Sequence, residues 1–216
     1  MSSTSQQLKD KMTADFEAGK KAFHEAMAKA QSQIDVATAE INKLRATLKT
    51  ETAEAKAKTT ARIDELNKKL DATRKEQQQK IEARLKELHT DIESVNAKLA
   101  AEGKAAVEAK AKAFREEYDA TRSALTASLD AELAEWEARI NAALDAAAEK
   151  KAGAKAAIQA KIAELRAKHE AAKKQLHALK QANVSAFDEL HRGVKTAIGE
   201  VKTAVHHAHA DIAAAL

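Results

Sequence analysis

The sequence predicts an all-α protein built from long antiparallel helices. The chain of 216 residues contains no proline and only five glycines, and aromatic residues make up 3% of it. It is built mainly from alanine, glutamate, lysine, leucine and arginine, a composition typical of coiled coils and long-helix bundles. Large apolar residues also recur every three or four positions, which is the period of an amphipathic helix. Strand-forming residues are scarce, so we expect no sheet.

The recurring apolar residues form one narrow stripe, here called the apolar seam, with alanine on its flanks. Alternating steps of three and four residues are typical of a helix that packs against another helix. The narrow stripe favours close helix–helix contact over broad burial in lipid. The clearest runs of the seam are Ile41, Leu44, Leu48; Ile63, Leu66, Leu70; Ile81, Leu85, Leu88, Ile92, Val95, Leu99; Leu125, Leu129, Leu133, Trp136, Ile140, Leu144; Ile158, Ile162, Leu165; and Leu190, Val194, Ile198, Val201, Val205.

Three interruptions of the apolar seam divide the chain into quarters. They lie between Leu48 and Ile63, around Gly103 and around Gly153, and each glycine follows a polar or basic helix end, as a C-terminal glycine does. A spacing of about fifty residues predicts an up-down four-helix bundle whose helices of about 48 residues are each about 70 Å long. We expect one domain over 1–216, with helices over 3–50, 55–102, 104–150 and 154–202 and a tail over 203–216.

The alternative is an extended antiparallel coiled-coil hairpin that turns only near Gly103, with arms about 150 Å long. In that arrangement the interruptions near residues 53 and 152 lie opposite each other. A compact bundle that opens at these paired positions into a hairpin is a physically reasonable two-state element.

Two blocks of opposite charge favour antiparallel neighbours. Residues 116–149 carry nine acidic and two basic residues, a net of −7, whereas residues 150–182 carry nine basic and two acidic residues, a net of +7. A turn near Gly153 lays these blocks against each other, and a parallel register would stack like charges. The same set of turns brings Phe16 and the segments 88–92, 114–118 and 187–190 to one level of the bundle.

Histidines form the one cluster that suggests a metal site. His206 and His209 share a helix face three residues apart, with His207 beside them, and imidazole nitrogens bind transition metals. The alternative interpretation is a solvent-exposed tail. Three further histidines lie at or beside the seam, where we expect them to fill the core or mark the register: His89, His169 and His177.

Nothing in the sequence resembles catalytic machinery. It contains no glycine-rich phosphate loop and no Gly-x-Ser-x-Gly motif, and a catalytic pocket needs irregular backbone that this chain hardly offers. We therefore predict no enzyme and no cofactor. The start of the chain has no apolar segment of the signal-peptide kind, and nowhere do eighteen apolar residues run together, so we expect a cytoplasmic protein without a membrane span.

In style the chain resembles exchangeable apolipoproteins and bacterial phasins, whose alanine-rich amphipathic helices cover lipid or polyester granules. The likeness covers the whole chain and rests on no motif, and the prolines that punctuate apolipoprotein repeats are absent. The segment 185–216, apolar on one side and basic on the other, is by its own pattern a helix that can lie on a membrane or on a lipid or polymer surface. The resemblance implies a surface-active binder of lipid membranes or hydrophobic granules.

Three functions therefore follow from the sequence. The first is a non-enzymatic scaffold that acts through helix–helix association with itself or with another helical protein. The second is the surface binder. The third is a protein that coats nucleic acid through the basic run 150–180, against which the net charge of only +4 and the absence of interleaved aromatics argue.

Overall fold

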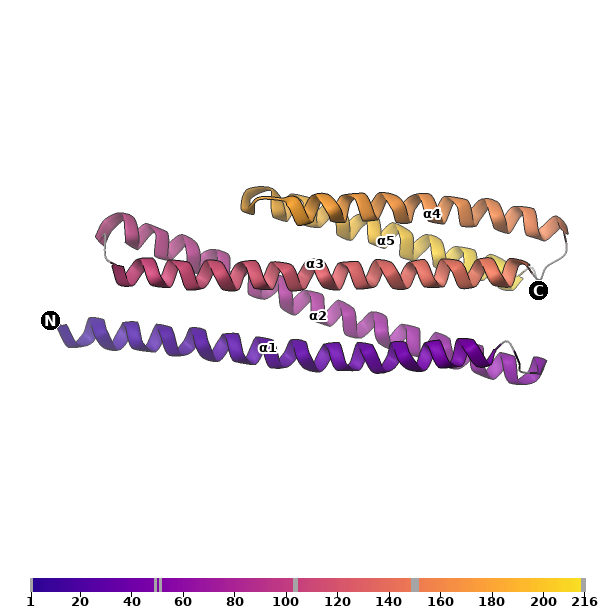
Figure 1. Ribbon diagram of the computed structural model, residues 1–216, viewed down its shortest axis with the longest axis horizontal. Helices are drawn as coiled ribbons and strands as arrows, with labels where there is room; N and C mark the ends of the chain where they lie inside the picture. Colours follow the sequence, from indigo (N-terminus) through magenta and orange to yellow (C-terminus); the bar gives the residue numbers. More distant parts are fainter. Residues whose placement is uncertain (1, 49, 51, 103–104, 149–151, 215–216) are drawn as a thin grey trace. The chain divides into compact units, whose positions relative to one another are not determined.

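A computed structural model describes residues 2–48, 50, 52–102, 105–148 and 152–214, with side chains described over 13–48, 50, 52, 54–97, 108–145, 158–183, 186–208 and 210. Every regular element in these ranges is a helix, as the sequence predicts. The five helices, in chain order, are α1 (Ser2–Thr47), α2 (Ala53–Glu102), α3 (Ala105–Ala148), α4 (Ala152–Gln181) and α5 (Val184–Ala214) (Figure 1).

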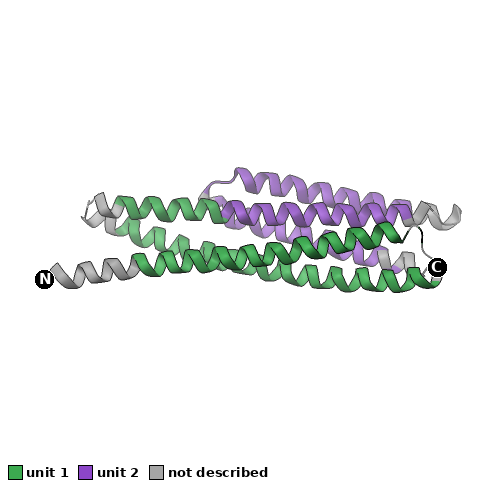
Figure 2. Cartoon of the chain, turned by 60° about the horizontal axis from the view of Figure 1, so that its bottom comes forward, with its two compact units in different colours: residues 1–121 green, residues 122–216 purple. Residues whose placement is uncertain are grey.

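The helices gather into two compact units (Figure 2). Unit 1 comprises Met1–Thr121 and holds α1, α2 and the first part of α3. Unit 2 comprises Arg122–Leu216 and holds the rest of α3 with α4 and α5.

In unit 1, α1 and α2 form an antiparallel pair (Figure 1). Arg62 of α2 pairs with Glu40 of α1 at 3.1 Å. Beneath this pair the seams of the two helices bury a shared apolar cluster of Ile34, Ala37, Ile41, Ile63, Leu66 and Leu70, with Leu44 and Leu48 packed against it.

The first interruption of the seam is a turn made without glycine. The Thr47 hydroxyl donates to the Leu44 carbonyl at 2.9 Å where α1 ends, and the Lys56 amide donates to the Thr52 carbonyl at 2.9 Å where α2 begins. Because α2 folds back onto α1 at this point, the hairpin that turns only near Gly103 is wrong.

Unit 2 is organised around α4, which runs antiparallel to both α3 and α5 (Figure 1). Seam residues from all three helices are buried, which confirms the predicted seam here. They are Leu125, Leu129, Leu133, Trp136 and Ile140 on α3; Ile158, Ile162 and Leu165 on α4; and Val194, Ile198, Val201 and Val205 on α5, joined by Leu176, Leu179 and Phe187.

The predicted fourth helix over 154–202 and the tail over 203–216 are wrong. The α4 helix ends at Gln181, and α5 begins at Val184 and continues to Ala214. The Ala182 amide closes the end of α4 on the Leu179 carbonyl at 3.2 Å, and the Asn183 side-chain oxygen accepts from the Ala186 amide at 2.9 Å. Asn183 is thus the N-cap of α5, a role that asparagine fills well. The last quarter is therefore two helices of 30 and 31 residues in place of one of about 48.

The interruption near residue 150 is confirmed, but the role predicted for its glycine is wrong. The α3 helix ends at Ala148 and α4 begins at Ala152, so Gly153 lies in the first turn of α4 and does not end α3. Residues 149–151 and Gly103 are outside the described ranges.

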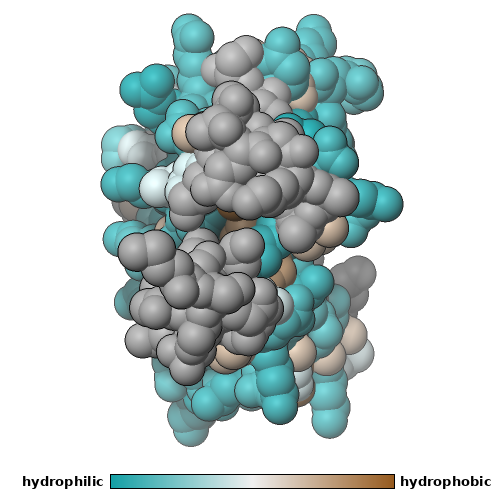
Figure 3. Space-filling view, turned by 90° about the vertical axis from the view of Figure 1, so that its left-hand side faces the viewer, coloured by the Kyte–Doolittle hydropathy of each residue, from teal (hydrophilic) through white to brown (hydrophobic). Residues whose placement is uncertain are grey.

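The apolar seams are used almost entirely between helices. Val36, 64% exposed, is the large hydrophobic side chain that remains exposed in the described part of the chain. On the face drawn in Figure 3, the side chains that are not grey are mostly hydrophilic. Burial of the seams against one another therefore accounts for most of the apolar surface that the sequence provides.

Candidate functional site

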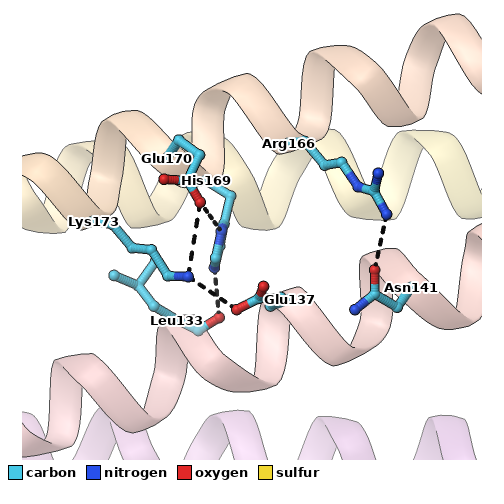
Figure 4. Close-up of polar contacts among 7 residues, drawn as sticks. All are labelled: Leu133, Glu137, Asn141, Arg166, His169, Glu170 and Lys173. Carbon is cyan, nitrogen blue, oxygen red and sulfur yellow. Dashed lines mark hydrogen bonds and ion pairs between the residues drawn. The ribbon is translucent and has the colours of Figure 1, made fainter.

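A group of polar contacts between two helices lies where α3 meets α4 in unit 2 (Figure 4). We call it the α3–α4 polar cluster. Its members are Leu133, Glu137 and Asn141 on α3 and Arg166, His169, Glu170 and Lys173 on α4.

His169 is the buried member of this cluster, with 3% of its surface exposed. Its Nε2 lies 2.8 Å from the Leu133 carbonyl oxygen, and its Nδ1 lies 3.8 Å from a carboxylate oxygen of Glu170 (Figure 4). Because a carbonyl oxygen can only accept, Nε2 carries the proton and donates it to α3. Because a buried imidazole is costly without a partner, this hydrogen bond holds α4 against α3 at the level of Leu133.

Charged side chains on the same face join α3 to α4 at several levels. Lys173 Nζ lies 3.0 Å from Glu137 Oε2, and Arg166 Nη2 donates to Asn141 Oδ1 at 3.2 Å (Figure 4). Lys180 bonds Asp130 further along. The partners follow one another in opposite chain order, which confirms that the acidic block on α3 lies antiparallel to the basic block on α4.

The Lys173–Glu137 pair predicts a small, pH-dependent contribution to stability. The hydrogen bond between them lowers the pKa of Glu137 below its ordinary 4.5 and raises the pKa of Lys173 above its ordinary 10.5. The contribution is therefore present between these values, lost as the pH falls through the lowered pKa of Glu137 and lost as it rises through the raised pKa of Lys173.

Because both side chains are more than a third exposed, at 42% and 49%, solvent screening keeps their coupling below about 1 kcal/mol. A double-mutant cycle with Glu137→Gln and Lys173→Met measures this coupling free energy by urea unfolding. We expect the coupling to be smaller near pH 3 than at neutral pH. A coupling that is equal at both pH values would contradict it.

Arg122 joins α3 to the turn between α4 and α5. Its guanidinium donates to the carbonyl of Leu179 at 3.4 Å and to that of Ala182, both at the end of α4. It also lies over the Phe187 ring at 4.6 Å, in the first turns of α5, and this ring stacks on His191 at 6.0 Å. One cation therefore adds a second donor to the Leu179 carbonyl, bonds the Ala182 carbonyl beyond the end of α4 and fixes where α5 starts.

Trp136 lies in the core of unit 2 among cationic side chains. Its ring is 1% exposed, and the Arg139 guanidinium lies 4.1 Å and Lys202 Nζ 6.0 Å from the ring centroid. The His206 ring meets it edge to face at 5.9 Å. Trp136 thus connects α3 to α5, and His206 belongs to this contact.

Unit 1 contains a buried carboxylate that links α3 to α1. The Glu117 side chain is 2% exposed, and its oxygens lie 3.2 Å from Lys20 Nζ and 3.4 Å from His24 Nε2. One turn away, Phe16 and Phe114 meet edge to face at 4.6 Å, which confirms the predicted common level for these two residues. The pairing anchors α1 on α3, because a buried carboxylate is costly without a cation beside it.

The predicted histidine cluster is only partly described. His206 lies against Trp136, and His207 is exposed between α4 and α5. The side chain of His209 is outside the described set, so the metal site stays a prediction. Among the described side chains, no three of His, Asp or Glu are grouped to hold a metal ion.

The seam histidines have different outcomes. The expectation of a core or register role is confirmed for His169, which is buried. A core role is wrong for His89 and His177, which are exposed. His89 lies 3.4 Å from Glu93 on its own helix, and its ring meets the Tyr118 ring of α3 at 6.4 Å. Sequence reasoning did not single out Arg122 or Glu117, since each owes its role to a helix distant in the chain.

The described contacts share one chemical property. His169, Lys173, Arg122 and Glu117 each use a donor or a charge to hold one helix against another. No described helix is long and apolar enough to cross a membrane. Comparison of the chain with protein-family models, with curated proteins and with solved structures finds no match in any of the three.

Proposed function

We propose that this protein is a non-enzymatic helical scaffold that acts through helix–helix association, with itself or with another helical protein. The observation that supports this most is the use of its polar side chains. The polar side chains that are buried or held by specific partners lie between helices and set the helix register, as do those of His169, Glu117 and Arg122. A chain whose polar side chains hold its helices in place is suited to presenting helical surfaces to a partner.

A second candidate function is the binding of lipid or a hydrophobic granule, and α5 is the observation that favours it. Its apolar residues Phe187, Val194, Ile198, Val201 and Val205 are all buried along one face. Released from α4, this face would make an amphipathic helix able to lie in an interface. In the described arrangement the face is covered, so the scaffold is the better-supported proposal.

Nucleic-acid coating is the weakest of the three proposals. Lys173 and Lys180 of the basic run are paired with Glu137 and Asp130 on α3. Binding DNA through them would require these internal pairs to be exchanged for phosphates.

Sedimentation velocity from micromolar to near-millimolar concentration tests the scaffold proposal, with vesicle flotation and DNA binding at two salt concentrations run on the same preparation. We expect concentration-dependent assembly and neither lipid nor DNA binding. A protein that remains monomeric and floats with zwitterionic vesicles would overturn the proposal in favour of the surface binder. DNA affinity that falls steeply with salt would overturn it in favour of nucleic-acid coating.

A further inference from the structure

The N-terminal half of α1 is packed less deeply in unit 1 than its C-terminal half. No residue from 13 to 33 is buried, whereas Ile34, Ala37 and Ile41 of the C-terminal half are buried against α2. The ribbons of α1 and α2 lie together at their turn and separate toward the N-terminus of α1 (Figure 1). We call residues 13–33 the α1 arm. The arm lacks the buried apolar cluster that holds the rest of α1 in place.

Small residues explain this shallow packing. Steps of three and four residues lead back from Ile34 through the arm, and every residue reached by them is half-buried: Ala30, Met27, Phe23, Gly19 and Phe16. Glycine and alanine provide little apolar surface, so two of these five positions contribute little to the hydrophobic attachment of the arm.

Arg84 of α2 lies against the arm. Its guanidinium carbon is 5.5 Å from the Phe16 ring centroid, and a Cβ built on Gly19 would lie 3.5 Å from its Nη1. Nη1 also meets Glu87 Oε2 at 3.3 Å, but Nε and Nη2 are buried without a hydrogen bond. A buried charged group with unpaired donors is costly. Packing of the arm over Arg84 therefore carries a penalty that water would remove.

The contact of the arm with α3 has the same property. The Glu117 side chain is 2% exposed, whereas its partners Lys20 and His24 are 41% and 53% exposed. Glu117 Oε2 lies 3.2 Å from Lys20 Nζ, but Oε1 is buried without a hydrogen bond, with His24 Nε2 3.4 Å away. Burying a carboxylate costs free energy that offsets much of its attraction to a cation. The ion pair therefore positions the arm while adding little net attachment.

We propose that the α1 arm is a strap that opens from α2 and α3 as one unit and leaves residues 34–48 packed on α2. Opening returns water to Arg84 and Glu117, and it gives up only half-buried side chains of the arm. The strap is a conformational device of unit 1 and does not depend on the proposed scaffold function. Because most helical stability in proteins comes from packing, the amides of the open arm lose protection from hydrogen exchange.

Hydrogen exchange of the full chain, resolved by residue in the regime where exchange reports the opening equilibrium, tests the strap. We expect amides 16–30 to exchange through one common opening, at least about tenfold more often than amides 35–47. Fraying from the end of the helix would instead give protection that rises gradually along α1, with no step at Ile34. A gradual profile of that kind, or equal protection in both halves of α1, would overturn the proposal.

Lys20→Met tests whether the arm opens as one unit. It removes a cation from the buried Glu117 carboxylate, so opening should become about tenfold more frequent at all amides from 16 to 30 and stay unchanged at amides 35–47. Lys21→Met is the matched control, because Lys21 is 80% exposed and pairs with Glu25 on its own helix. It should change the opening by less than about twofold. A rise confined to the residues around Lys20, or one that is equal at amides 35–47, would contradict the strap.

Two further variants should make the strap open less, so that loss of the fold cannot imitate their effect. Gly19→Ala adds a methyl group at ordinary contact distance from Arg84 and favours the helix, which should reduce opening about two- to fivefold. Arg84→Met keeps much of the aliphatic stem and removes the unpaired donors, which should reduce opening about fivefold. More frequent opening of the Arg84→Met variant would mean that Arg84 holds the arm through Phe16, and the proposal would be wrong.

Discussion

Replacing Trp136 with alanine is expected to lower the free energy of unfolding by about 3–5 kcal/mol, the range for removing a fully buried tryptophan. The ring is 1% exposed and meets Arg139 on α3 and both Lys202 and His206 on α5. Its loss leaves a cavity between these helices and removes the ring from the cations around it, which adds to the cost of the lost apolar burial.

Urea unfolding followed by far-UV circular dichroism measures this effect. The chain has a single tryptophan, so fluorescence cannot follow the variant. Trp136→Phe should recover more than half of the loss, because it restores most of the ring volume. Val36→Ala is the control for a large apolar residue that is 64% exposed, and it should change the free energy of unfolding by less than about 0.5 kcal/mol. A loss below about 1 kcal/mol for Trp136→Ala would show that the ring is not packed as described.

Replacing Arg122 with alanine is expected to cost about 2–3 kcal/mol. The guanidinium donates to two carbonyls at the end of α4 and lies 4.6 Å from the Phe187 ring centroid at the start of α5. Hydrogen bonds from a charged group are worth about 1.5–3 kcal/mol and a cation over an aromatic ring about 0.5–2 kcal/mol, while water can reach the freed helix end and offsets part of the loss.

Arg122→Lys distinguishes charge from geometry. Lysine keeps the positive charge but cannot spread donors to two carbonyls while stacking on a ring, so its stability should lie between those of the wild type and the alanine variant. In both Arg122 variants the rate of amide hydrogen exchange should rise first around Asn183, where α5 begins, before it rises in the middle of α3. Equal stability of the lysine and alanine variants would mean that Arg122 acts through its charge and not by joining these groups.

Predictions from the sequence are strongest where a property depends on local spacing. The all-α class follows from composition, and the buried faces follow from the three-four steps, as Leu129, Leu133 and Val201 show. The opposite charge blocks also predict the antiparallel relation of α3 and α4. The electrostatic attraction between the blocks is summed over many residues and does not depend on a single contact.

The break between α4 and α5 shows the limit of that reasoning. Asn183 is a good N-cap residue, yet asparagine also occurs within helices, and the apolar steps continue past it from Leu179 to Phe187. The free energies of a capped break and of a continuous helix differ by little in an isolated segment. The carbonyls of Leu179 and Ala182 become favourable ends for α4 because Arg122, about sixty residues earlier, bonds them.

By itself the sequence determined that this protein is helical, which face of each helix is apolar and which segments attract one another, because each of these depends on residues a few positions apart. Only the tertiary structure decided where α5 starts, that His169 is buried while His89 and His177 are exposed, and that Glu117 is buried beside Lys20 of α1. These features depend on single partners contributed by distant helices. A hydrogen bond or a cavity at one position changes when a helix rotates or slides by one residue, whereas the average charge and apolarity of a face hardly change.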